Sequence, residues 1–396
     1  MRDDTYLLTV NAGSSSVKFT VFRGGDISNA VFTASVENIG QVASLVTVNG
    51  SAKSVNATTH TIAIKVLIGA LTEEIPLGNI TAVGHRIVHG GPNYYKPQLI
   101  TSQLLDDLRT LVAFDPEHLP AQLSLIEVFA RQLADVPQVA CFDTAFHHDL
   151  PTSAQLLPIP RRFAAEGIRR YGFHGLSYDF IVTELRRVEG EAAANGKVII
   201  AHLGSGASLV GLKDGKSVDT TMGMTPASGI PMSTRSGDLD PGLALYLQCT
   251  QGYTLDKFNH MVNFESGLLG ISETTADMRK LLELEDHDER AKEAIDLFCY
   301  QVKKSIGGLA ASLGGINTLV FTGGMGENAP KVRAKICEGL EFLGVMLDQG
   351  QNQQSARLIS ASTSQAGVHV IHTNEAITIA RQTSEIVSNK KQGNDR

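Results

Sequence analysis

The sequence contains no long hydrophobic run, no cluster of basic residues and no closely spaced pair of cysteines. Because no apolar run reaches membrane-spanning length and residues 1–4 lead straight into a strand-like segment, we expect neither a transmembrane helix nor a signal peptide. We therefore expect a cytoplasmic protein that does not bind membranes. The net charge of -7 and the lack of a basic run argue against nucleic acid as the main partner.

Cysteine is scarce and scattered. Cys141, Cys249, Cys299 and Cys337 lie far apart in the sequence, so we expect reduced thiols, and neither a zinc site nor a disulfide framework. The rest of the composition is that of an ordinary globular protein, with 42% hydrophobic and 19% charged residues. A chain of 396 residues is long enough for two domains that each bury a core.

An apolar run near the start of the chain is interrupted by a turn of small residues and then resumes, which predicts a β-hairpin over residues 7–22. The backbone N–H groups of such a turn can bind an anion, and Lys18 lies just beyond it. The same pattern returns at residues 198–208, an offset of 191 positions that aligns Gly13 with Gly204 without a gap. An offset of nearly half the chain predicts two related domains and excludes a solenoid of short repeats.

The remaining periodicity predicts an alternation of strands and helices. In the first half we expect strands at residues 30–36, 43–48, 80–83 and 138–142, and helices at 59–74, 102–114 and 120–134. Residues 150–160 are rich in proline, so a helix cannot run through them, and we expect them to form the crossover into the second domain. In the second half we expect helices from about 176 to 188 and at 242–251, 255–264, 276–284, 288–313 and 329–340, strands at 317–322 and 368–372, a glycine turn at 323–328 and a terminal helix.

Four glycine-bearing turns follow apolar strands, at Gly13, residues 84–91, residues 204–206 and residues 323–326. Backbone amides in such turns suit an extended anion such as a nucleotide triphosphate, and their repetition favours a nucleotide site. Residues 219–241 form a loop too long to be typical of a compact domain unless it is functional, so this loop is a candidate site.

Three arginines stand at loops marked by glycine or proline, where a guanidinium can clamp a carboxylate or a phosphate: Arg86, Arg170 and Arg235. Of these, we interpret Arg170 as an ordinary surface residue. Asp143 follows a strand and could hold Mg²⁺ or steer a nucleophile, or simply cap the next turn. His118, His174 and His202 border candidate loops and could donate to a transferring phosphoryl group, although a lone histidine is more often structural.

Together these loops resemble the acetate kinase family, within the superfamily of actin, sugar kinases and heat-shock chaperone ATPases. The matching stretches span nearly the whole chain in family order: residues 11–18, 85–91, 142–146, 170–177, 202–208, 219–241, 321–328 and 374–375. The resemblance implies an α/β protein with two duplicated ribonuclease-H-like β-sheet domains, flanking helices and an interdomain nucleotide cleft. Residues 1–149 with the C-terminal helix 376–396 would form the N-terminal domain, and residues 150–375 the nucleotide-binding domain.

The resemblance also implies roles for individual residues. Catalysis would fall to Asp143, His174, Arg235 and Arg86, with Arg86 also binding the substrate carboxylate beside an acyl pocket of Val88, Phe173, Pro226 and His118. The nucleotide site would be lined by Lys18, His202, Leu203, Gly204, Ser205, Gly206, Asp277, Met278, Arg279, Gly324, Met325, Gly326, Glu327 and Asn328. Asn11 and Glu375 would place Mg²⁺ or Mn²⁺, ATP would be the phosphoryl donor, and the family is typically homodimeric.

The implied reaction is reversible in-line transfer of a phosphoryl group from ATP to a short-chain carboxylate, giving an acyl phosphate and ADP. A carboxylate is already ionised at neutral pH and needs no general base, so Asp143 is expected to orient groups or act through a metal. Asp143→Asn is therefore expected to abolish acyl phosphate formation.

Several positions depart from the common family pattern. Tyr178, Ser233 and Ser205 replace a histidine, a glycine and an asparagine, and all three are small or polar loop substitutions. Glu117 matters more, because the residue before the equivalent of His118 is commonly an apolar member of the acyl pocket. A desolvated carboxylate there would be costly, so we expect Glu117 to point away and acetate to be preferred.

Two other interpretations stay open. Within the class, the enzyme could be a propionate or butyrate kinase. Outside it, the same scaffold serves nucleotide-switched ATPases without carboxylate kinase activity, although such a switch needs no arginines aimed at a small carboxylate. A carbohydrate kinase is a weaker fit, although it too would need an acidic residue.

Overall fold

The computed structural model describes residues 5–13, 16–40 and 44–394, and divides the chain into two compact units. Unit 1 comprises Met1–Phe146 together with Asn374–Arg396, and unit 2 comprises His147–Thr373. Ser14 and Ser15 of the predicted anion-binding turn and Ala43 of a predicted strand lie outside the described residues.

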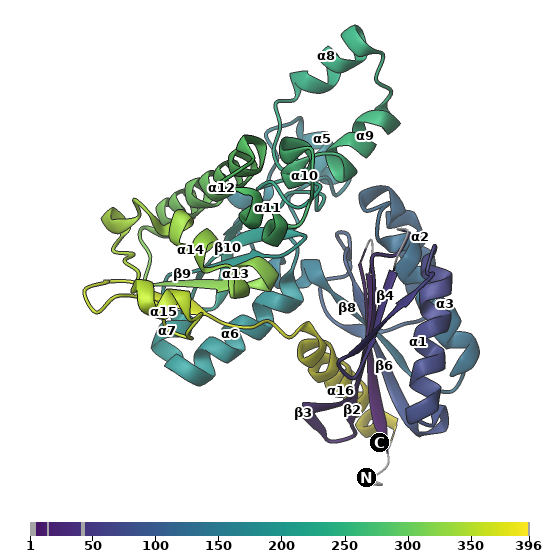
Figure 1. Ribbon diagram of the computed structural model, residues 1–396. Helices are drawn as coiled ribbons and strands as arrows, with labels where there is room; N and C mark the ends of the chain where they lie inside the picture. The colour runs from purple at the N-terminus through teal and green to yellow at the C-terminus, as the bar shows by residue number, and fades with distance from the viewer. Residues whose placement is uncertain (1–4, 14–15, 41–43, 395–396) are drawn as a thin grey trace. The chain divides into compact units, whose positions relative to one another are not determined.

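Unit 1 is built on an eight-stranded sheet with the order β5-β4-β3-β2-β1-β6-β8-β7 (Figure 1). Its strands are β1 (Tyr6–Ala12), β2 (Ser16–Arg23), β3 (Asp26–Glu37), β4 (Ser44–Val48), β5 (Ser51–Val55), β6 (Ile80–Ile87), β7 (Gln98–Leu99) and β8 (Gln138–Phe142). Strands β1 to β5 form an antiparallel meander, whereas β6 runs parallel to β1, and β8 parallel to β6. The predicted first hairpin is therefore confirmed.

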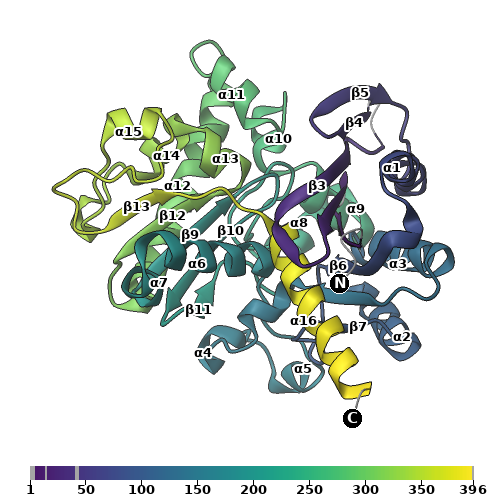
Figure 2. The same ribbon diagram turned by 90° about the horizontal axis from the view of Figure 1, so that it is seen from below.

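Side chains of β1 alternate between two packed layers, as the pleat of a strand requires. Leu8 joins a core with Leu67 of α1 (His60–Glu74) and Phe129 of α3 (Leu119–Gln132), whereas Leu7 packs toward Ala380 of α16 (Glu375–Asn394). The sheet thus lies between α1 and α3 on one face and α16 on the other (Figures 1 and 2).

Helix α16 reaches the sheet closely because β6 has a glycine there. A Cβ on Gly84 would lie 2.2 Å from the Thr383 hydroxyl oxygen, too near for any larger residue. Helix α2 (Ser102–Thr110) and the 3₁₀ turn η2 (Leu111–Phe114) replace the single helix predicted at 102–114. The first turn of α2 is capped by the Thr101 side chain, which accepts from the N–H of Leu104.

Unit 2 is built on a five-stranded sheet with the order β11-β10-β9-β12-β13. Its strands are β9 (Val198–Leu203), β10 (Ala207–Lys213), β11 (Lys216–Thr220), β12 (Thr318–Thr322) and β13 (Gly367–Val370). Every residue of β9 is buried, in keeping with helices on both faces, α12 (Glu289–Leu313) and α6 (Gly175–Glu189) (Figure 1). The order β11-β10-β9-β12-β13 repeats the order β3-β2-β1-β6-β8 of unit 1, so the predicted duplication is confirmed.

The other helices of unit 2 are short: α4 (Thr152–Gln155), α5 (Arg161–Ala165), α7 (Glu191–Asn195), α8 (Gly242–Gln251), α9 (Leu255–Phe264), α10 (Gly267–Ser272), α11 (Met278–Leu284), α13 (Gly323–Asn328), α14 (Pro330–Cys337) and α15 (Gln349–Gln353). No helix runs through the proline-rich segment 150–160, which holds only the four-residue α4. The prediction of a glycine turn at 323–328 was wrong, because these residues form helix α13. Residues 221–241 contain neither helix nor strand, as predicted.

Candidate active site

In unit 1, three predicted site residues lie at or just beyond the ends of neighbouring parallel strands. Asn11 lies near the end of β1, Arg86 near the end of β6 and Asp143 directly after β8. Because β1, β6 and β8 are adjacent and parallel, their carboxyl ends meet at one edge of the sheet, the edge where ligands bind in sheets of this kind. Glu375, the first residue of α16, reaches the same edge through its contact with Asn11.

These four side chains form one hydrogen-bonded cluster. The Nε and one terminal nitrogen of Arg86 donate to Oδ2 of Asp143 at 2.9 and 2.6 Å, and the other terminal nitrogen donates to Oδ1 of Asn11 at 3.0 Å. The Asn11 amide nitrogen donates to Oε2 of Glu375 at 2.6 Å. Asp143 is fully buried, and within the described structure these bonds use three of the five N–H groups of Arg86.

The cluster holds Arg86 firmly in its charged form. Burial would by itself lower the pKa of the guanidinium, but the negative charges of Asp143 and Glu375 more than offset this effect, and the pKa is raised above its usual value. Arg86 is therefore a fixed, partly accessible cation at the edge of the sheet, with 14% of its side chain exposed.

Asn11 and Glu375 fit a magnesium ion that takes most of its coordination from water and from the phosphates of a bound nucleotide. Mg²⁺ keeps several waters and in nucleotide sites takes only one or two protein oxygens beside the substrate phosphates. The Glu375 carboxylate and the Asn11 amide lie side by side and supply such oxygens. Among the described residues no group of three or more His, Cys, Asp or Glu could hold a metal on its own.

Two predicted pocket residues of unit 1, Val88 and His118, are also buried. His118 precedes α3, and its Nδ1 lies 2.7 Å from Oδ1 of the buried Asp115. The N–H of Val88 donates to Gln122 of α3 at 3.1 Å, which fixes the loop after β6 against that helix. Glu117 is half-buried, and its orientation toward a bound acid stays a prediction.

Lys18 is paired with Asn11 across the first hairpin, so both side chains lie on the same face of the sheet. More than half of the Lys18 side chain is exposed, and its ammonium lies 3.8 Å from the carboxylate of Glu37. An exposed pair at this distance holds the lysine only weakly. Its ammonium is therefore available to a phosphate.

In unit 2, His174 adopts a left-handed backbone conformation, with φ 58° and ψ 23°, at the N-cap of α6. Its Nδ1 lies 2.8 Å from the Ser208 hydroxyl, and its ring stacks on that of His202 with centroids 4.4 Å apart. A Cβ on Gly206 would lie 3.2 Å from Nε2 of His174 and 3.6 Å from a terminal nitrogen of Arg235. The structure therefore brings His174, Arg235 and the glycine turn after β9 together.

The loop that presents Arg235 is fastened to α10. The N–H groups of Ser266 and Leu268 donate to the carbonyls of Thr234 and Met232 at 3.0 and 2.9 Å. Gly267, with φ +60°, lies so close that a Cβ there would be 2.1 Å from the Met232 carbonyl oxygen and 2.7 Å from that of Arg235. Only glycine fits at this position.

The two predicted nucleotide turns of unit 2 are neighbours. Strands β9 and β12 are parallel, with His202 beside Thr322, so residues 203–206 and helix α13 begin at the same edge. Gly323 has φ +78°, and a Cβ on it would be 2.9 Å from the Leu203 carbonyl carbon. Gly323 and Gly326 of α13 therefore lie beside Leu203, which directly precedes the glycine turn after β9.

The side chains of Glu327 and Asn328 form hydrogen bonds with backbone groups of the segment after β12. One carboxylate oxygen of Glu327 accepts from the N–H groups of Gly323 and Thr373 at 2.9 and 3.0 Å, and the other lies 2.8 Å from His372. The Asn328 amide donates to the Gly324 carbonyl at 3.0 Å. The Glu327 carboxylate therefore stabilises the backbone of the turn.

The second half of α13 rests on a buried arginine that the sequence did not single out. Arg333 is fully buried and donates to the carbonyls of Gly326 and Glu327, and to Asn352 and Ser355. Burial lowers its pKa to about 10, so the guanidinium remains charged at neutral pH. Carbonyl oxygens at the end of a helix are favourable partners for a cation.

The segment 277–279 opens α11 at the surface. The Asp277 carboxylate caps the helix by accepting from the Arg279 N–H at 3.0 Å, and it also pairs with the Arg279 guanidinium at 2.7 Å. These bonds lower the pKa of Asp277. The Arg279 side chain is 86% exposed, so it can turn to meet a ligand, whereas Met278 is buried.

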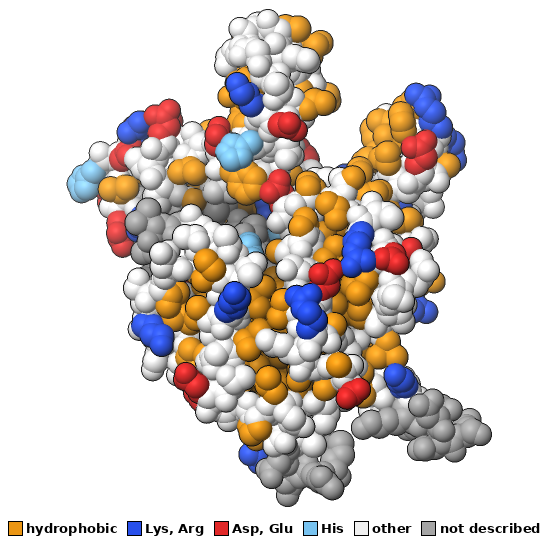
Figure 3. Space-filling model, turned by 90° about the vertical axis from the view of Figure 1, so that its right-hand side faces the viewer, with side chains coloured by type: hydrophobic (Ala, Val, Ile, Leu, Met, Phe, Trp, Pro, Cys, Tyr) orange, Lys and Arg blue, Asp and Glu red, His pale blue; other side chains and the backbone are white. Residues whose placement is uncertain are grey.

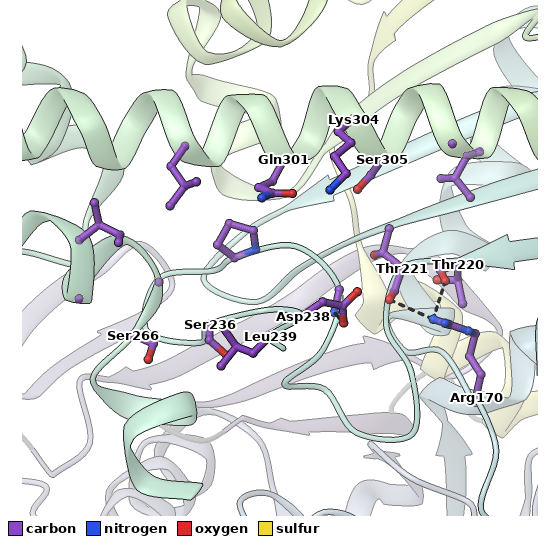
Figure 4. Close-up of a pocket in the computed structure, with 18 of the residues that line it drawn as sticks. Arg170, Thr220, Thr221, Ser236, Asp238, Leu239, Ser266, Gln301, Lys304 and Ser305 are labelled. Atoms are coloured by element: carbon purple, nitrogen blue, oxygen red, sulfur yellow. Dashed lines mark hydrogen bonds between the residues drawn. The ribbon is translucent and has the colours of Figure 1, made fainter. Parts of the chain in front are cut away.

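The loop 219–241 also borders a cavity of about 720 Å³ that none of the predicted ligand-binding residues lines. Gln301, Lys304 and Ser305 of α12 point into it from one side and the loop residues Asp238 and Leu239 from the other (Figure 4). Arg170 stands at its end and donates to the carbonyls of Thr220, Thr221 and Met222 at 3.1 to 3.2 Å. The interpretation of Arg170 as an ordinary surface residue was therefore wrong, because it holds the start of the loop.

Two general features accord with the composition. In the described part of the chain, no helix is both long and apolar enough to cross a membrane. On the face of the molecule in Figure 3, acidic and basic side chains are interspersed and form no extended basic surface.

The sequence did not reveal the residues that support His174. Ser208 and Tyr178 share a hydrogen bond of 2.5 Å, and His147 bonds to the Phe173 carbonyl. Ser208 belongs to the repeated hairpin motif, whereas His147 directly follows the matching stretch 142–146. Their partners lie 26 to 34 residues away, and the sequence contains no signal for these pairings.

Known proteins resemble the whole chain. A family model described as the acetokinase family matches residues 6–381. An acetate kinase of Rhizobium meliloti is 43% identical over 96% of this chain and 98% of its own length, and one of Rhodopseudomonas palustris is 42% identical over 95% and 96%. Among solved structures, a propionate kinase from Francisella tularensis (TM-score 0.89, 35% identity) and the acetate kinase of Porphyromonas gingivalis (TM-score 0.86, 33% identity) match 96% and 97% of this chain and 100% of their own.

Proposed function

The chain belongs to the acetokinase family, and we propose that it catalyses the reversible, ATP-dependent phosphorylation of a short-chain carboxylate, with acetate as the preferred acid. The observation that carries the proposal is the cluster around Arg86, a permanently charged guanidinium with N–H groups beyond those bonded to Asp143 and Asn11. A planar guanidinium is well suited to a carboxylate.

The reaction must bring two anions together. Two unit charges about 4 Å apart repel by roughly 4 kcal/mol at an effective dielectric near 20. In the proposed mechanism Arg86 binds the carboxylate, and His174 and Arg235 stabilise the charge on the phosphoryl group as it is transferred in line. An arginine in that role is worth on the order of a thousandfold or more in rate.

Asp143 acts in this mechanism by orienting Arg86, because the substrate is already ionised and has no proton to remove. Its Oδ2 accepts hydrogen bonds from two N–H groups of Arg86, and these two bonds fix the plane of the guanidinium. Asn11 and Glu375 would hold Mg²⁺ or Mn²⁺, and a bound metal neutralises charge on the ATP phosphates.

The nucleotide is assigned to Lys18, to the turns after β9 and β12, and to residues 277–279. Support comes from the neighbouring glycine turns of unit 2, whose backbone N–H groups can approach phosphates without obstruction by side chains. The residues proposed to contact the acyl group are Val88 and His118 of unit 1 and Phe173 and Pro226 of unit 2, and each of them is buried.

The second copy of a homodimer is the proposed partner. Helices α8 and α9 expose large apolar side chains, with 64% of Leu245, 60% of Tyr246 and 80% of Leu255 accessible in the single chain. Exposed apolar groups of this size are typical of an interface. We place the protein in the cytoplasm, which accords with its four free cysteines.

Hydroxamate trapping of the acyl phosphate, with acetate, propionate, butyrate and a hydroxylated acid compared at equal concentration, tests the proposal. We expect the highest kcat/KM for acetate. A higher value for propionate or butyrate would identify the alternative within the class, as the name of the Francisella relative suggests. A clear preference for the hydroxylated acid would show that Glu117 faces the substrate. If none of the acids changed the rate of ATP hydrolysis, the result would instead favour a nucleotide-switched ATPase.

A further inference from the structure

His147 is a buried histidine of unit 2 to which the mechanism above gives no role. Only 2% of the residue is exposed. Its Nε2 lies 3.0 Å from the Phe173 carbonyl oxygen, and its Nδ1 lies 2.9 Å from the Ser217 hydroxyl on β11. The ring therefore connects β11 to the peptide that directly precedes His174.

The partners of His147 determine which of its nitrogens bears the hydrogen. A carbonyl oxygen can only accept, so Nε2 donates to Phe173, and Nδ1 accepts from the Ser217 hydroxyl. Burial lowers the pKa of His147 to about 4, and the bond to the Phe173 carbonyl offsets this only in part. The ring is thus neutral at neutral pH, with a single N–H that points at the backbone.

The peptide that His147 holds is conformationally demanding. His174 has φ 58°, a left-handed conformation that is unfavourable for a residue with a side chain. Gly172, two residues earlier, has φ +73°, and a Cβ there would lie 2.7 Å from the His147 ring and from Thr220. Glycine adopts left-handed backbone readily, but at His174 this conformation persists only if its surroundings hold it.

Two sets of contacts hold the segment on either side of Phe173. The N–H groups of Tyr171 and Gly172 both donate to the Gly223 carbonyl, at 2.9 and 3.3 Å. The His174 side chain bonds to Ser208, at 2.8 Å. The bond from His147 lies between these contacts, on the carbonyl of the peptide that joins Phe173 to His174.

We infer that His147 is a positioning residue for His174: its Nε2–H holds the Phe173 carbonyl and so fixes the left-handed turn that aims the His174 ring. The inference rests on the proposed function, in which His174 stabilises the transferring phosphoryl group. His147 acts through His174 and touches neither substrate nor nucleotide.

His147→Phe keeps a ring of similar shape but removes both hydrogen bonds. Since a misplacement of about 1 Å can cost roughly a hundredfold in rate, we expect kcat to fall 10- to 100-fold, with the KM values for acid and ATP nearly unchanged. His147→Gln retains a donor for the Phe173 carbonyl and is expected to recover most of the loss. An unchanged kcat for His147→Phe would overturn the inference.

Two further variants separate positioning from general destabilisation. His369→Phe replaces another buried histidine of unit 2 whose pKa is also lowered by burial, and it should reduce the melting temperature but not kcat. In a His174→Ala background, His147→Phe should reduce kcat no further, because the group that it positions is gone. A full additional loss there would also contradict the inference.

A measurement independent of activity is the side-chain NMR spectrum of ¹⁵N-labelled histidine. The wild-type protein should show His147 as the neutral Nε2–H tautomer, without protonation above pH 5. An Nδ1–H tautomer, or titration near pH 6.5, would refute the inference even in a protein without kinase activity. Absence of acyl phosphate with the wild-type protein, by contrast, would count against the proposed function alone.

Discussion

At the scale of single residues, Arg86 and Asp143 depend on each other. Asp143 is fully buried and contributes the negative charge nearest to Arg86. Removing one partner of a buried ion pair is strongly destabilising, because the other charge stays behind. Glu375, with an oxygen 4.0 Å from Arg86, compensates only in part.

Asp143→Asn is therefore expected to reduce acyl phosphate formation to background and to lower the melting temperature. The first effect follows from misorientation of Arg86, and the second from its uncompensated charge. Hydroxamate trapping and thermal unfolding measure the two. Asp107→Asn is a suitable control, since Asp107 is also a hydrogen-bonding carboxylate of unit 1 but binds Tyr94 and Gln103, away from the cluster. Ordinary turnover of Asp143→Asn would refute the role assigned here.

Site residues near the ends of strands could be predicted from sequence. The residues that hold site side chains in place by hydrogen bonds could not. Asn11 and Asp143 each follow an apolar run, Arg86 lies just beyond the predicted strand 80–83, and parallel strands bring such ends together. The contacts of His147 with Ser217 and of His174 with Ser208 join segments far apart in the chain. Such pairings depend on tertiary packing, which local periodicity does not encode.

At the scale of elements, the junction between the Arg235 loop and α10 is a tight approach near the site. Gly267→Ala would place a methyl group 2.1 Å from the Met232 carbonyl oxygen, so the loop must move. We expect kcat to fall at least tenfold, and the melting temperature to drop.

Gly252→Ala supplies the control, because Gly252 has φ +66° but no neighbour within 4 Å of an added Cβ. It introduces comparable backbone strain, of about 1 kcal/mol, without the clash. Kinetics of the two variants measured side by side separate strain from displacement of Arg235. Equal, small effects on kcat would contradict the claim that this contact positions the arginine.

Long elements could be predicted well and short ones poorly. Helix α9 agrees with its predicted range at both ends, and the 25-residue helix α12 begins one residue later than predicted, since their apolar periodicity spans the whole element. Helices α10 and α13 have six residues each and were missed, because so short a segment shows no clear period. Their glycines also disfavour helix locally and are explained only by the close approach of Met232 and Leu203.

At the scale of the whole molecule, stability is expected to fall as the pH falls below about 6. His85 and His147 are buried and neutral, and burial lowers the pKa of each to about 4. In the unfolded chain both bind a proton near pH 6.5, so the unfolded state takes up more protons in this range. Each group then contributes a slope of about 1.4 kcal/mol per pH unit between the two values.

Thermal unfolding between pH 8 and pH 5 measures this effect. The melting temperature should be nearly constant above pH 7 and decline toward pH 5. His85→Gln should weaken the decline, whereas His287→Gln, at an exposed position, should leave it unchanged. A melting temperature that rises on acidification would contradict the assignment of neutral buried histidines.

The duplication is the feature of the whole molecule that the sequence predicts most directly. The offset of Gly13 and Gly204 relates β1-β2-β3 to β9-β10-β11, and the structure extends the correspondence to β6-β8 and β12-β13. The outer strands β4, β5 and β7 have no counterpart in the sheet of unit 2, and β5 and β7 are too short and polar to be predicted.

The stoichiometry of a single reaction shows whether the protein transfers a phosphoryl group from ATP to a carboxylate. The purified protein is incubated with ATP, Mg²⁺ and acetate, and both ADP and hydroxamate-trapped acyl phosphate are measured, with and without the acid. We predict equal amounts of the two products, and almost no ADP when acetate is omitted. ADP release that does not depend on acetate, without acyl phosphate, would contradict the account.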